Sequence, residues 1–70
     1  MDRIDAAGLA CPQPVLLALE KIKTAEGPFE IAVNNQAAVE NVTRAVESQK
    51  WTVSGLQTDK DTFILTVSKS

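Results

Sequence analysis

The sequence predicts an α+β protein, a two-layer βαβαββ sandwich in which two helices cover one face of a mixed four-stranded sheet. Two segments, residues 12–25 and 36–49, have the apolar spacing of amphipathic helices. The segments before, between and after them contain the alternation of apolar and polar residues that is typical of half-buried strands. Because each helix has a single apolar face, both are expected to pack on the same side of the sheet.

The first half of the chain predicts one strand and one helix. Residues 3–6 form the short first strand, and the helix follows at 12–25. Its buried stripe has the i, i+3, i+4, i+7 spacing and consists of Val15, Ala18, Leu19 and Ile22. Leu17 falls on the opposite, solvent-facing side, where it is a candidate contact for a partner that docks over the neighbouring thiol. Gly27-Pro28 ends the helix.

A second strand and a second helix follow. Residues 29–33 alternate as a strand with one buried face, and Asn34 and Asn35 close that strand and cap the helix at 36–49. The buried face of this helix consists of Ala38, Val39, Val42, Ala45 and Val46.

The last third of the chain predicts a hairpin. Residues 51–57 form a strand that places Trp51 in the core, and Gly55 predicts a bulge in it. Residues 58–61 have the composition of a turn, and 63–68 alternate as the last strand.

The order of the elements brings distant loops together. A right-handed crossover makes the first two strands parallel. Parallel strands send their strand-to-helix loops to the same edge of a sheet, so we expect Cys11 to be a neighbour of Asn34 and Asn35. The turn at 59–61 also lies at this edge if the third strand runs parallel to the second.

Composition excludes several classes of protein. Seventy residues predict a single domain. The net charge of −2 argues against nucleic acid as a partner, because phosphate binding requires a basic face. One cysteine and no histidine exclude a Cys/His metal site within one chain, and no cofactor is expected. No apolar run approaches the ~20 residues of a membrane span. The N-terminus has no apolar signal segment, and a single thiol fits a reducing, cytoplasmic location.

The chemistry of the chain is concentrated in Cys11-Pro12-Gln13-Pro14. Pro12 suits the first position of a helix, which places Cys11 at or beside the N-cap, and Pro14 still lies in the first turn. The N–H of Gln13 remains available to an anion. A helix N-terminus stabilises a thiolate and lowers the pKa of a thiol from its usual value of about 8.5. The motif therefore predicts a rigid support that presents one reactive sulfur.

Alternatives remain open for several of these residues. Free cysteine is often a small buried apolar residue, so Cys11 is either reactive or structural. Asn34 and Asn35 are candidates for hydrogen bonding near the sulfur, and turn and cap duty is the competing interpretation.

The sequence resembles a known family. Asp5, then Gly8-Leu9-Ala10-Cys11-Pro12-Gln13-Pro14 and the helical run, resembles the signature of the TusA/SirA family of small sulfur-relay proteins, whose hallmark is the Cys-Pro-x-Pro core. Residues 35–44 and 47–49 resemble the N-terminal domain of YedF proteins, which are linked by name to selenium metabolism. The likeness covers nearly the whole chain, and it implies the βαβαββ sandwich predicted above.

The resemblance also implies a function. Cys11 would carry sulfur, or selenium, as a persulfide from a donor to an acceptor, acting as a sulfurtransferase-type carrier with partner enzymes. A cysteine desulfurase or a DsrE-like protein is the kind of partner implied. Residues that would shape the site or contact the partner are Pro12, Gln13, Pro14, Leu17, Asn34 and Asn35. YedF proteins usually carry a second, DsrE-like domain, so residues 1–70 are either an isolated first domain or a standalone relative.

The chain departs from the family pattern at two positions, and two functions other than sulfur transfer remain as alternatives. Asn34 replaces an acidic residue often found after the second strand, and Lys50 replaces the glycine that usually follows the second helix. One alternative function is a non-catalytic interaction module whose Cys-Pro-x-Pro loop is structural. The other is RNA binding, which βαβαββ sandwiches also support, although the acidic balance argues against it.

Overall fold

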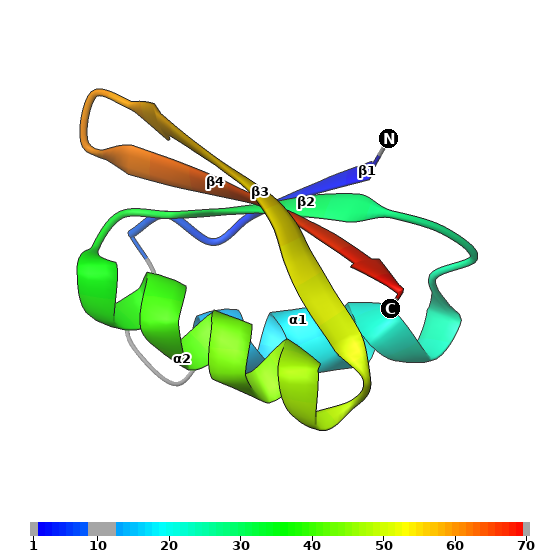
Figure 1. Cartoon of the computed structure of the whole chain (residues 1–70). Helices are drawn as coiled ribbons and strands as arrows, with labels where there is room; N and C mark the ends of the chain where they lie inside the picture. Colours follow the sequence, from blue (N-terminus) through cyan, green and yellow to red (C-terminus); the bar gives the residue numbers. More distant parts are fainter. Residues whose placement is uncertain (1, 9–12, 70) are drawn as a thin grey trace.

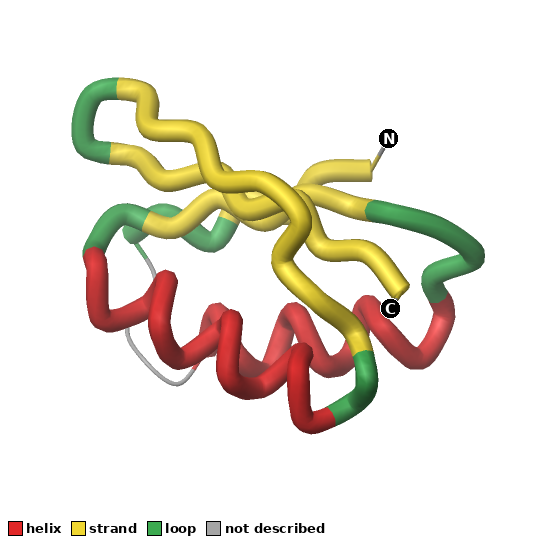
Figure 2. The backbone as a smooth tube through the Cα atoms, in the orientation of Figure 1, coloured by secondary structure: helices red, strands yellow, loops and turns green. Residues whose placement is uncertain are grey.

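The computed structural model of the chain describes residues 2–8 and 13–69. The elements are β1 (Asp2–Asp5), α1 (Gln13–Thr24), β2 (Phe29–Val33), α2 (Gln36–Ser48), β3 (Trp51–Asp59) and β4 (Thr62–Lys69). The strands form one sheet in the order β1-β2-β4-β3, with β1 parallel to β2 and the other neighbouring pairs antiparallel. Both helices lie on one face of this sheet (Figures 1 and 2). The predicted fold class is confirmed.

The core lies between the sheet and the helix layer. The side chains that are buried there are Ala18, Phe29, Ile31, Val33, Ala38, Val39, Val42, Val46, Trp51, Leu65 and Val67. Trp51 packs against Phe29, with ring centroids 5.8 Å apart and planes inclined at 52°. This tilted contact confirms Trp51 as a core residue.

The two inner strands are buried on both faces, which the alternation pattern did not predict. Ala32 and Ile64 point to the face without helices, yet both are buried. They are directly paired across β2 and β4, and Asp5 and Gln57 flank them on the outer strands. Neighbouring side chains of a sheet are close enough to cover a small or branched residue between them.

The helix α2 begins and ends with local hydrogen bonds. Asn35 is its N-cap, and the Asn35 side chain accepts a hydrogen bond from the Ala38 N–H at 2.7 Å. At the other end the N–H of Lys50 donates to the Glu47 carbonyl at 3.1 Å. Lys50 has a φ of 65°, so a lysine takes the left-handed conformation that glycine usually supplies after a helix.

The hairpin of β3 and β4 is longer than predicted. The third strand continues to Asp59, and only Lys60 and Asp61 form the turn. Asp59 and Thr62 join the ladder because Lys60, with a φ of 57°, turns the chain within two residues. The predicted bulge is confirmed, since the register shifts between Val53 and Gly55.

Candidate functional site

Cys11 and Pro12 lie outside the described residues, so the site is defined by the segments on either side of them. These segments are the end of β1, the start of α1, the connection from β2 to α2, and the β3–β4 turn. The parallel register of β1 and β2 sends the first two connections to the same edge of the sheet. Figure 1 shows the end of β1 and the β2–α2 connection at one end of the molecule.

The segment before the cysteine is held by three features. The Ala6 N–H donates to the Ala32 carbonyl at 2.9 Å and extends the β1–β2 ladder by one residue. The Asp5 carboxylate accepts a hydrogen bond from the Ala7 N–H at 3.2 Å, which forms a local turn. Gly8 has a φ of 87°, a conformation that other residues rarely adopt. The chain therefore leaves the sheet in a defined direction.

The segment after the cysteine is the first turn of α1. Gln13 is the first helical residue and is exposed, whereas the Pro14 side chain is fully buried. A proline is tolerated at position 14 because the N–H groups of the first helical turn have no intrahelical partner. Its burial fixes the start of α1 to the core, two residues after the position of Cys11.

The prediction that Leu17 lies on the solvent-facing side of α1 is wrong. Leu17 is half-buried and packs against the core, and it lines a shallow cleft between β1 and α1 with Ile4 and Thr24. The buried face of α1 is centred on Pro14 and Ala18, and this rotates the helix so that Leu17 turns toward the sheet.

The same rotation moves the other side of α1 outward. Leu16, not Leu17, is the exposed leucine, with 55% of its surface accessible. Leu19, predicted to be in the buried stripe, lines a groove on the outer side of α1 together with Leu16 and Lys23. Leu17 is therefore less exposed than predicted, and its contact with a partner stays a prediction.

Asn34 and Asn35 lie where the sequence predicts, at the end of β2, and both are exposed. The Asn35 side chain caps α2, and its amide donates to the Asn34 side-chain oxygen at 3.3 Å. Cap duty is therefore confirmed for Asn35. The two helix N-termini open at one edge of the sheet, and their partial positive charges favour an anion there.

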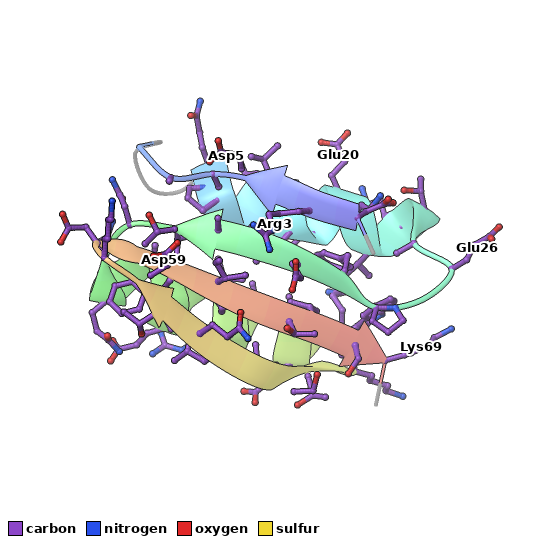
Figure 3. The ribbon with its side chains drawn as sticks, turned by 90° about the horizontal axis from the view of Figure 1, so that it is seen from above. Arg3, Asp5, Glu20, Glu26, Asp59 and Lys69 are labelled. Atoms are coloured by element: carbon purple, nitrogen blue, oxygen red, sulfur yellow. The ribbon has the colours of Figure 1, made fainter. Side chains whose placement is uncertain are left out.

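The β3–β4 turn lies at this same edge. Because β3 and β2 are both antiparallel to β4, they run in the same direction, and the turn follows β3 at the edge where β2 also ends. Figure 3 shows Asp5 and Asp59 toward one end of the sheet and Lys69 toward the other. The sequence predicts the turn at this edge only if β3 runs parallel to β2, and the structure meets that condition.

Within 2–8 and 13–69, no three His, Cys, Asp or Glu side chains gather in a way that could hold a metal ion. Within the same ranges, neither helix has the length and apolar character needed to cross a membrane.

Two comparisons agree on what this arrangement is. The described residues form a two-layer α+β sandwich, and the sequence between β1 and α1 contains the only cysteine of the chain. The chain matches the model of the sulfurtransferase TusA family over residues 2–69 and belongs to that family. It is similar to a SirA-like protein from Desulfitobacterium hafniense whose crystal structure is known. The TM-score is 0.86 and the identity 27%, and the match covers 97% of this chain and 96% of that one.

A search of curated proteins finds no match. Membership of the TusA family supports a sulfur-carrier role in which partner proteins take part. The predicted resemblance to the TusA/SirA family is confirmed.

Proposed function

We propose that Cys11 carries sulfur as a persulfide between a donor protein and an acceptor protein. The observation that carries this proposal is the start of α1, the helix that follows the thiol in the sequence. Cys11 stands two residues before the start of a helix of 12 residues whose first turn is fixed by the buried Pro14. A helix start favours the thiolate, and the thiolate is the form that attacks.

Two exchange steps account for the relay. The Cys11 thiolate attacks the terminal sulfur of a persulfide on the donor, a new S–S bond forms, and the donor cysteine leaves as a thiolate. The acceptor thiolate then attacks the terminal sulfur on Cys11, and the Cys11 thiolate is released. No external oxidant or reductant is required, because each step breaks one S–S bond and forms another.

The neighbouring residues have distinct roles in this proposal. The rings of Pro12 and Pro14 restrict the backbone on either side of Gln13, and the N–H of Gln13, in the first turn of α1, is available to an anion. Asn35 supports the adjacent helix start through its cap, and Asn34 lines the same edge. No histidine exists in the chain to act as a base, so protons are exchanged with solvent or the partners.

The donor is proposed to be a cysteine desulfurase and the acceptor a DsrE-like protein. Selenium can follow the same two steps if the donor cysteine carries a terminal selenium, because each transfer then forms one S–Se bond as another S–Se bond breaks and a thiolate leaves. A single thiol with no partner cysteine in the chain fits a reducing compartment, which supports a cytoplasmic location.

Intact-mass spectrometry tests the proposal. The protein is incubated with a cysteine desulfurase and cysteine, and the expected product gains the mass of one sulfur atom, which dithiothreitol removes. Cys11→Ser is the control and should gain nothing. Wild-type protein without added sulfur, or an equal gain in Cys11→Ser, would reject the proposal and favour a non-catalytic interaction module.

A further inference from the structure

The β3–β4 hairpin extends beyond its neighbouring strand at the edge of the candidate site. Val33, the last residue of β2, is paired with Phe63. The hairpin continues past that pair through Asp59 and Thr62 to its turn. The hairpin tip, defined as residues 59–62, therefore lies at the same end of the sheet as the connection from β2 to α2 (Figure 1).

The hairpin exposes apolar surface on the side that faces the helix layer. Leu56 is paired with Leu65, so the two side chains share that face. Leu65 is fully buried, but Leu56, on the edge strand, remains 51% exposed. Phe63 lies diagonally across from Leu56 on the same face and is only partly buried. Leu56 and Phe63 form the hairpin patch.

Charge at this end of the molecule has one predominant sign. Asp59 and Asp61 are exposed on the hairpin tip, and Asp5 lies at the same end of the sheet (Figure 3). Lys60 is the basic residue between the two carboxylates of the tip. Lys69 lies at the opposite end. An approaching surface that carries basic residues is therefore favoured here.

We propose that the hairpin patch and the acidic tip form the docking surface for the sulfur donor. The donor presents basic residues to Asp59 and Asp61 and inserts an apolar side chain against Leu56. This inference rests on the proposed function, because the donor must approach the edge where the segments on either side of Cys11 lie. A second copy of this chain is a poor occupant, since two hairpin tips in contact would bring carboxylates together.

Leu16 provides a matched control. It is 55% exposed, close to the 51% of Leu56, and it lies on the outer side of α1 rather than on the hairpin. The groove beside it carries both Glu20 and Lys23, so it has no single charge preference. Leu16→Ser and Leu56→Ser therefore remove equal amounts of exposed apolar surface at two different places.

The test measures the dissociation constant for the cysteine desulfurase that loads the protein. Leu56→Ser should weaken binding about tenfold, as loss of a central apolar contact does. Asp59→Asn with Asp61→Asn should weaken it about threefold to tenfold at low salt and flatten its salt dependence. Leu16→Ser should remain within about twofold of wild type, because it lies outside the interface.

Two results would overturn the docking surface. One is wild-type affinity in both hairpin variants, and the other is a larger loss in Leu16→Ser than in Leu56→Ser. Sulfur loading at saturating donor separates this failure from failure of the proposed function. If wild type gains sulfur while the hairpin variants bind normally, only the docking surface is wrong. If wild type gains no sulfur, the relay itself is wrong.

Discussion

Replacing Lys50 with glycine should stabilise the protein. Lys50 has a φ of 65° directly after the C-cap of α2. A left-handed conformation costs a residue with a Cβ atom about 1–2 kcal/mol. Glycine avoids that cost but loses about 0.5–1 kcal/mol through the greater freedom of its unfolded chain. We therefore expect a net gain of roughly 0.5–1 kcal/mol in the free energy of unfolding, or about 3–6 °C in Tm for a domain of this size.

The assay is urea unfolding followed by Trp51 fluorescence, with thermal unfolding as a second measurement. Gln49→Gly is the matched control, because Gln49 has a φ of −103°, which residues other than glycine adopt without strain. It should lose about 0.5–1 kcal/mol of stability. Opposite signs at two adjacent residues would tie the effect to backbone conformation. A destabilised Lys50→Gly, or equal losses in both variants, would refute the reasoning.

Three further predictions concern stability and charge. Two of them change residues beside the candidate site, and the third changes the ion pair of Lys21 with Asp2. Asn35→Ala should lose about 1 kcal/mol in urea unfolding because it removes the cap on α2, whereas Asn34→Ala should remain within about 0.5 kcal/mol of wild type; equal losses would contradict the cap. Gly8→Ala should lose about 1 kcal/mol from its left-handed backbone alone, since open space surrounds the added methyl group; an unchanged midpoint would show that the strain is absent. The hydrogen bond and charge of Lys21 lower the pKa of the Asp2 carboxyl below its usual value of about 3.9. The stability from this pair should thus be present above the unfolded pKa and lost as the pH falls through the folded pKa. Carboxyl NMR titration should show that Lys21→Met raises the Asp2 pKa toward its usual value, and a pKa unchanged by the substitution would rule out the pairing.

Local patterns in the sequence were sufficient for most of the fold. The alternation at 29–33 and the apolar spacing at 36–49 predict β2 and α2 to within a residue, because both are bounded by strong signals. Asn35 is both a turn residue and a cap, so one residue marks the end of the strand and the start of the helix. The Cys-Pro-x-Pro motif could also be recognised from the sequence, since its residues are consecutive in the chain.

Features that depend on packing were harder to predict. The rotation of α1 follows from the burial of Pro14, which sequence periodicity does not count as part of an apolar stripe. As a result the exposed leucine was placed at position 17 instead of 16. Burial of Ala32 on the open face depends on its neighbours across the sheet, and the alternation within one strand contains no information about them.

The site was predicted only in part for the same reason. The loops after β1 and β2 could be placed together because a parallel pair requires it. The hairpin tip joins them only because β4 lies between β2 and β3, and this strand order is not encoded in any local segment. Leu56 has the pattern of an ordinary strand residue, and its exposure became evident only from its position on the edge strand.

The rate of alkylation of Cys11 as a function of pH tests the central claim most directly. The claim is that the start of α1 makes this thiol a reactive thiolate. Iodoacetamide modification of the folded protein, followed by intact mass, should give a midpoint clearly below the value of about 8.5 for a free thiol. The midpoint should rise to about that value in urea, where the helix is lost. A midpoint at or above this usual thiol value of about 8.5 in the folded protein would contradict the account.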